Sequence, residues 1–274
     1  MARLASLRDA VAEHVRDGQT VALEGFTHLI PVAAGQEIIR QRRRDLTLVR
    51  MTPDLVYDQM IGMGCARRLI FSWGGNPGVG SLHRMRDAIE KGWPQPLQLE
   101  EYSHAAMAAA YAAGASGLPF GLLRGFAGTD LPAHNENVRW VTCPFTGERL
   151  SAVPALNPDV TIIHAQQADR AGNVRLRGII GVQKEAALAA KVAIATVEEV
   201  VDDVTDEMNA VVLPGWSLGA VCHVPRGAWP SYAHGYYDRD NRFYQEWDDI
   251  SRDRERFLSW MKQHVLPPPR LLAS

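Results

Sequence analysis

Asp159-Val-Thr-Ile-Ile-His164 is the stretch that decides the fold of this 274-residue chain. A short, continuous apolar run of this kind is typical of a strand that is buried on both faces of a sheet. Similar runs recur along the chain, and patterns with a helical period separate them. This alternation predicts an α/β fold with a mainly parallel sheet covered by helices on both faces.

The expected elements follow from the same two patterns. Strands are predicted at 20–24, 46–50, 68–71, 97–100, 159–164 and 192–196. Helices are predicted at 7–15, 32–41, 54–63, 81–91, 103–113 and 183–190. We expect Gly18 to cap the first helix at its C-terminus, Ser81 to cap the fourth at its N-terminus, and Pro31 to lie at the start of the second.

Length and composition favour a cytoplasmic protein of one domain, residues 1–274. The net charge is −2 and the pI about 6.5, which gives no indication of binding to nucleic acid or to an anionic membrane. No run approaches the ~20 apolar residues that a membrane span needs, and the N-terminus lacks the apolar core of a signal peptide. The three cysteines are widely spaced, which predicts reduced thiols in or near the core.

The segment 225–274 differs from the rest of the chain because aromatic and charged residues alternate in it. Two interpretations are open. The segment could form a layer of helices and loops packed around the sheet, or it could form a subunit interface, since Tyr and Trp are enriched in interface cores.

Ligands of parallel α/β folds bind outside the carboxyl ends of the strands, and the first polar motif lies at such an end. In Leu23-Glu-Gly-Phe-Thr-His-Leu-Ile-Pro31 a strand runs through a glycine turn toward a helix. We predict that Glu24, Gly25, Phe26 and Thr27 contact the substrate. An ordinary strand–helix turn is the alternative, and the motif matches neither a dinucleotide fingerprint nor a phosphate loop.

Two further motifs follow strands. Phe71-Ser-Trp-Gly-Gly-Asn-Pro-Gly-Val-Gly80 could close over a thioester, with Gly74, Gly75 and Asn76 as the substrate-binding residues, or it could simply cap the next helix. In Ile163-His-Ala-Gln-Gln-Ala-Asp169, Gln166 is the predicted substrate contact. Alternatively, Gln166 and His164 satisfy buried backbone groups.

The chain shows no self-sufficient catalytic centre. Glu24, Glu100 and Glu101 lie at or near strand ends, where a carboxylate could act as a nucleophile or could serve structure alone. No serine nucleophile is predicted, and because there is no H-x-x-x-H pair, no metal site is predicted either.

Taken in order, these motifs resemble the class I coenzyme A transferase family, and specifically the A subunit of its glutaconate-type members. The stretches that carry the resemblance are Asp17-Gly18, Gly25-Phe-Thr27 with Pro31, Asp45-Leu-Thr47, Asn76, Glu101-Tyr-Ser103, Gly117-Leu-Pro-Phe120, Ala152-Val-Pro154 and Ile162-Ile-His-Ala-Gln-Gln-Ala168. Together they cover most of the chain.

The resemblance implies a heterodimer or heterotetramer of A and B chains with the active site between them. It implies that no catalytic residue lies in this chain, because a glutamate of the B chain attacks the acyl-CoA and becomes a glutamyl-CoA thioester. A carboxylic acid then takes the CoA. Coenzyme A is a substrate in this scheme, and no cofactor is implied.

Two positions depart from the family pattern, and two other functions stay open. Glu24 replaces the first glycine of the usual pair, and Pro77 replaces a small hydroxyl residue, which argues against glutaconate as the acceptor. Related A/B pairs instead hydrolyse a carbon–carbon bond in a steroid-derived CoA thioester, and Glu101 would then be a candidate acid or base. The chain could also be a non-catalytic binding or scaffold subunit.

Overall fold

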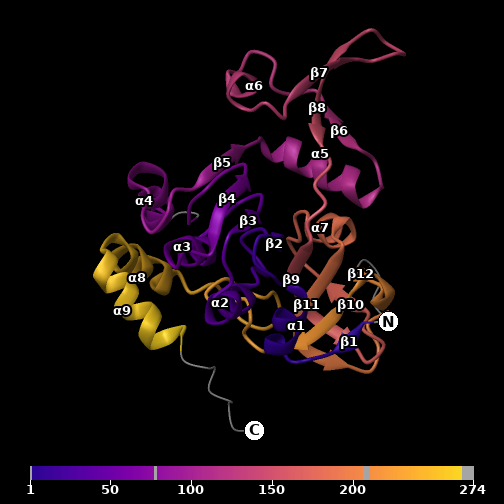
Figure 1. Ribbon diagram of the computed structural model, residues 1–274. Coiled ribbons are helices and arrows are strands. Elements are labelled where there is room, and N and C mark those ends of the chain that lie inside the picture. Colours follow the sequence, from indigo (N-terminus) through magenta and orange to yellow (C-terminus); the bar gives the residue numbers. More distant parts are fainter. Residues whose placement is uncertain (1, 77–78, 206–209, 267–274) are drawn as a thin grey trace.

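The computed structural model describes residues 2–76, 79–205 and 210–266, and most of them build one large sheet (Figure 1). Its strands lie side by side in the order β1 (Arg3–Leu4), β13 (Ala220–His223), β11 (Val192–Val201), β9 (Val160–Asp169), β2 (Thr20–Glu24), β3 (Leu46–Val49), β4 (Ala66–Phe71) and β5 (Gln98–Glu101). Every neighbouring pair in this order is parallel. The predicted parallel α/β fold is confirmed.

Helices cover both faces of this sheet. One face carries α1 (Leu7–His14), α2 (Val32–Arg40), α3 (Leu55–Gly62) and α4 (His83–Lys91), and the other carries α5 (His104–Ala115) and α7 (Gln183–Ala189). Side chains alternate between the two cores along a strand, so Leu23 packs on the α2 side and Ala22 on the α5 side. Glu24 therefore points to the same side as Ala22, toward α5.

Strand β9 is longer than the sequence predicted. It continues past His164 to Asp169 because β11 pairs with it along its whole length and β10 (Val174–Leu176) pairs with its last residues antiparallel. Strand β12 (Val211–Leu213) then pairs with β10, and the short 3₁₀ helix η1 (Gly215–Ser217) follows it. Gln166 consequently lies inside a strand and not beyond its end.

A small antiparallel arm projects beyond β5 and α5, away from the rest of the large sheet (Figure 1). It consists of β6 (Phe120–Leu123), β7 (Arg139–Thr142) and β8 (Arg149–Pro154) in the order β6-β8-β7, with the short helix α6 (Leu131–His134). The sequence analysis missed this arm because its strands are short and half exposed, without the buried apolar runs of the main sheet. The prediction of one domain for 1–274 stays a prediction.

The C-terminal segment forms a helical layer, as the first of the two interpretations predicted. Helices α8 (Asn241–Arg252) and α9 (Arg254–His264) lie beside α3 and α4 (Figure 1). Trp247 is fully buried and its indole Nε1 donates to Asp58 at 3.3 Å, while the Phe257 ring packs on Gly62. Whether the same segment also forms a subunit interface stays a prediction.

Two cap predictions are wrong. Helix α1 ends at His14 with Val15 as its C-cap, three residues before Gly18. Helix α4 begins at His83, and the Ser81 amide instead donates to Asp248 of α8 at 3.1 Å, so the contact with the C-terminal layer replaces the cap. Pro31 does lie at the start of α2, as its N-cap residue.

Candidate functional site

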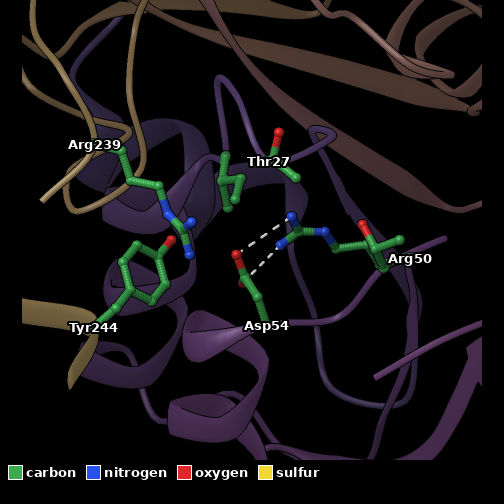
Figure 2. A pocket seen from close by; sticks show the side chains of 7 residues that line it. Thr27, Arg50, Asp54, Arg239 and Tyr244 are labelled. Atoms are coloured by element: carbon green, nitrogen blue, oxygen red, sulfur yellow. Dashed lines mark hydrogen bonds and ion pairs between the residues drawn. The ribbon is translucent and has the colours of Figure 1, made fainter. Parts of the chain in front are cut away.

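The carboxyl ends of β2, β3 and β4 bring the first two predicted motifs together. Thr27, from the loop after β2, lies beside Thr52 and Asp54, from the loop after β3, at a cavity of about 10 Å³ (Figure 2). The Gly75 amide, after β4, donates to the Pro53 carbonyl at 3.0 Å. The cavity holds about one water molecule, so it is too small to enclose an organic substrate.

The loop after β2 folds back tightly on itself. A Cβ at Gly25 would lie 2.6 Å from the Leu29 carbonyl oxygen, and Thr27 and Leu29 both have positive φ, 58° and 52°. Ser231 Oγ donates to the Thr27 carbonyl at 2.9 Å, and the Leu29 amide donates to Tyr232 O at 2.9 Å. Gly25 is thus required by the loop's own geometry, and the C-terminal segment holds that strained loop in place.

His28 locks the same loop to two other segments as a neutral ring. Its Nδ1 donates to the Ile179 carbonyl at 2.9 Å, and its Nε2 accepts the His234 amide at 3.0 Å. Burial lowers the pKa of His28 below its ordinary value. A second proton would also break the bond to His234, so geometry and burial both favour the neutral form.

Arg50 is buried at the end of β3 and is committed to two partners. Its guanidinium pairs with Asp54 at 2.8 Å and donates to the Gly25 carbonyl at 2.9 Å, and Figure 2 shows the pairing with Asp54. Asp54 also caps α3, since its carboxylate accepts the Val56 amide. The ion pair therefore connects the end of β3 to the start of α3 and to the loop that follows β2.

Glu24 is buried at the end of β2, and a backbone amide and a tyrosine bind its carboxyl group. Its Oε1 accepts the Met51 amide at 3.1 Å and the Tyr111 hydroxyl of α5 at 2.8 Å. Burial raises the pKa of Glu24 to about 7, and the charge of Arg50 and these hydrogen bonds offset burial only in part. A carboxyl with this pKa exists in both protonation states near neutral pH.

The loop after β4 presents polar and aromatic side chains next to the first loop. Ser72 Oγ donates to the Met51 carbonyl at 2.7 Å and lies 3.1 Å from His104 Nδ1, and Trp73 is exposed. The His104 and Phe26 rings pack edge to face with centroids 6.0 Å apart. Phe26, Ser72, Trp73 and His104 thus share one accessible edge.

The predicted residues of the glycine-rich loop differ in exposure. Gly74 is exposed, whereas Gly75 is buried against the Trp73 ring. Asn76 is also buried, and neither polar atom of its side chain is hydrogen-bonded to any residue that the structure describes. Pro77, a predicted departure from the family pattern, lies outside the described residues.

Gln166 and His164 are occupied by the protein itself. The Gln166 amide exchanges hydrogen bonds with the Arg177 backbone, donating at 3.1 Å and accepting at 3.1 Å. His164 lies between Thr196 Oγ1 at 2.8 Å and the Glu198 carboxylate at 2.7 Å. This geometry favours the interpretation in which both side chains satisfy buried groups.

The other two acids at a strand end differ from Glu24. Glu100 is paired with Arg68 and accepts hydrogen bonds from the Tyr102 hydroxyl and from Asn137 Nδ2, the last at 2.8 Å. Glu101 is exposed at the last position of β5. Glu100 is therefore engaged in structure, and Glu101 stays accessible.

The sequence analysis missed Arg50, Met51, His104 and Tyr111. Arg50 carried a signal, because a charged residue that ends an apolar strand lies at the ligand-binding edge of the sheet. The other three carried none, since Tyr111 reaches Glu24 across 87 positions of sequence.

Within the described ranges, no three His, Cys, Asp or Glu side chains are grouped so that they could hold a metal ion. The described part of the chain also contains no helix with the length and apolarity of a membrane span.

Comparisons with known proteins agree with this fold and with the motifs. A profile for the family described as coenzyme A transferase matches residues 4–223. The A-type subunit of 3-oxoadipate CoA-transferase from Pseudomonas knackmussii is 68% identical over 97% of this chain and 94% of its own length.

Two more distant relatives span nearly the whole chain. The A-type subunit of glutaconate CoA-transferase from Acidaminococcus fermentans is 35% identical over 97% of this chain and 88% of its own length. The crystal structure of that enzyme superposes with a TM-score of 0.90, covering 97% of this chain and 89% of the other. A cholesterol ring-cleaving hydrolase subunit from Rhodococcus jostii is 26% identical over 95% of this chain and 90% of its own length. The resemblance inferred from the motifs is confirmed: the chain belongs to the coenzyme A transferase family, as a subunit of the A type.

Proposed function

We propose that this chain pairs with a B subunit to transfer CoA from an acyl-CoA to a 3-oxo dicarboxylic acid. The catalytic glutamate belongs to the B subunit, where it carries the glutamyl-CoA intermediate. The acceptor is inferred from the 68% identity to the A-type subunit of a 3-oxoadipate CoA-transferase. The family resemblance implies a glycine at the position of Glu24, and this departure argues against glutaconate as the acceptor.

One observation carries the placement of the nucleophile on the partner. Glu24 is buried and accepts two hydrogen bonds, and Glu100 is paired with Arg68, so neither presents a free carboxylate to a thioester. Glu101 is exposed at the end of β5, but no side-chain hydrogen bond or ion pair to a described residue holds its carboxylate in place for attack. The loops of this chain thus supply the walls of a pocket that a second chain completes.

Trapping the intermediate tests this proposal. The A and B chains are mixed with an acyl-CoA and treated with borohydride, which reduces a glutamyl thioester to an alcohol, and the peptides are read by mass spectrometry. We expect one modified glutamate, in the B chain, and no turnover by the A chain alone. The absence of any trapped residue in an active complex would favour the ring-opening hydrolase, with Glu101 as its acid or base.

The non-catalytic alternative has its own outcome in the same assay. A B chain that turns over at the full rate without this chain would make this chain a scaffold. We expect instead that neither chain is active alone, because the pocket walls and the nucleophile lie on different chains.

A further inference from the structure

A continuous chain of hydrogen bonds runs from the buried core to the accessible edge of the site. Glu24 Oε1 accepts a hydrogen bond from the Met51 amide at 3.1 Å, and the Met51 carbonyl accepts one from the Ser72 hydroxyl at 2.7 Å. Ser72 Oγ in turn lies 3.1 Å from His104 Nδ1. These hydrogen bonds therefore connect the end of β2, the loop after β3, the loop after β4 and the first residue of α5.

The direction of each bond fixes the tautomer of His104. A carbonyl oxygen can only accept, so the single Ser72 hydroxyl proton points at Met51 O. Ser72 Oγ must then accept a hydrogen bond from the ring, and His104 Nδ1 carries the proton. This leaves Nε2 as the ring atom available to an outside partner, since Nε2 makes no hydrogen bond to a residue in the described ranges.

The ring is held on a second side by packing. Phe26, one of the predicted substrate contacts, meets it edge to face at a centroid distance of 6.0 Å and an angle of 81°. The His104 side chain is nevertheless exposed. A histidine that is oriented from two directions and still accessible is pre-organised for a ligand, because little side-chain freedom remains to be lost on binding.

We propose that His104 recognises the distal carboxylate of a dicarboxylic acyl acceptor, and that Ser72 is the positioning residue that aims its Nε2 at that group. The inference rests on the proposed transferase function and names the residue that selects the substrate class. In its protonated form the ring donates Nε2–H to the carboxylate as a charge-assisted hydrogen bond. The neighbouring cation Arg50 is unsuited to this task because it is buried and already pairs with Asp54 at 2.8 Å.

The experiment measures selectivity in the assembled A/B enzyme. The ratio of kcat/KM for 3-oxoadipate to kcat/KM for 3-oxohexanoate compares a dicarboxylic acceptor with a monocarboxylic one of the same chain length. We expect His104→Ala to lower this ratio about 10- to 100-fold, the value of one hydrogen bond to a charged group. His264→Ala, which removes an exposed histidine at the end of α9, serves as the matched control and should leave the ratio unchanged.

The positioning step is tested by a pair of variants at Ser72. Ser72→Ala removes the acceptor for His104 Nδ1 and should lower the ratio about 3- to 10-fold. Ser72→Thr keeps the hydroxyl and should restore the ratio, which a merely structural loss at this position would not do.

Two other outcomes would overturn the inference. An unchanged ratio in His104→Ala would show that the ring does not meet the distal carboxylate. An equal loss for both acceptors would assign the ring to folding or to the acyl-transfer step. If His104→Ala fails to assemble with the B chain, the ratio in the Ser72 pair decides. Failure of the proposed function itself would look different, because wild-type enzyme would then transfer CoA to neither acceptor.

Discussion

Two buried glutamates in strands of the main sheet have opposite electrostatic behaviour. Glu24 at the end of β2 and Glu198 in β11 are 2% and 6% exposed, and each accepts a tyrosine hydroxyl, from Tyr111 at 2.8 Å and from Tyr237 at 2.5 Å. Burial raises the pKa of Glu24 to about 7. Burial also acts to raise the pKa of Glu198, yet its bonds to His164, Tyr237 and Arg226 hold that pKa below the ordinary value.

The difference lies in what the polar groups beside each carboxylate already bind. His164 gives one ring proton to Thr196, whose own hydroxyl donates to the Ile163 carbonyl, and directs the other nitrogen at Glu198. Arg50, near Glu24, is shared with Asp54 and the Gly25 carbonyl. Glu198 has several donors of its own and becomes a fixed structural connection, whereas Glu24, whose neighbouring guanidinium is bound elsewhere, exists in both protonation states near neutral pH. The latter lies directly beside the proposed substrate edge.

Removing the well-paired carboxylate should have the largest effect. Glu198→Ala leaves buried His164, the Tyr237 hydroxyl and the Arg226 amide without their acceptor. We expect a loss of about 3 to 5 kcal/mol in the free energy of unfolding. Urea denaturation measures this loss, and Glu199→Ala, the exposed neighbour in β11, should cost under ~0.5 kcal/mol. A loss at Glu198 no larger than this control would refute the comparison.

The pH dependence of the free energy of unfolding should contain a contribution from the ionisation of Glu24. Its folded pKa of about 7 lies above the ordinary value of 4.5, so its contribution is fully present below pH 4.5 and is lost as the pH rises through 7. The expected loss is about 3 kcal/mol across this window. Glu24→Gln, which has the shape of the neutral acid, should remove that part of the slope.

A second buried carboxyl, Asp58 of α3, has a raised pKa in the same range, so the pH profiles of wild type and Glu24→Gln must be subtracted from each other. The pKa of Asp58 is also raised to about 7 by burial, so wild type and Glu24→Gln share its contribution and the difference between them isolates Glu24. Identical slopes in both proteins would mean that Glu24 is ionised throughout the window.

Replacing the two tyrosines that donate to these carboxylates should change the pH dependence of stability in different ways. Tyr111→Phe and Tyr237→Phe each remove one hydrogen bond to a buried acid, and each should cost about 1 to 2 kcal/mol. Tyr111→Phe should raise the pKa of Glu24 further and move its window upward, since the hydroxyl lowers that pKa. Tyr237→Phe should raise the pKa of Glu198 toward its ordinary value of 4.5, so that variant loses stability mainly above pH 4.5 and the loss shrinks as the pH falls. Urea denaturation from pH 4 to 8 measures both, and matching pH profiles would contradict the distinction.

How much of this was readable from sequence depends on the range of the interaction. Apolar runs such as Val160–Ile163 predicted the main sheet, because a strand buried on both faces has to be apolar throughout. The turn at Gly25 and Thr27 was predicted because a turn at the end of a strand is a local feature of the sequence. The environment of Glu24 was not, since Met51 and Tyr111 reach it from other elements. From sequence alone, the Glu24 carboxyl could equally have had donors of its own like those of Glu198, because the fold determines which side chains surround it.

The smallest expected effect comes from Tyr236, next to Tyr237 in sequence. Its hydroxyl donates to Glu199 Oε2 at 2.8 Å, a bond as short as that of Tyr111 to Glu24, but Tyr236 is 40% exposed and Glu199 is exposed as well. Water can replace the lost partner, so Tyr236→Phe should cost under ~0.5 kcal/mol in urea denaturation of the isolated chain. If it costs as much as Tyr237→Phe, then bond length and not burial governs these contacts. The contrast between Glu24 and Glu198 would then need a different cause, because it assumes that a carboxylate depends on its partners only where water cannot reach it.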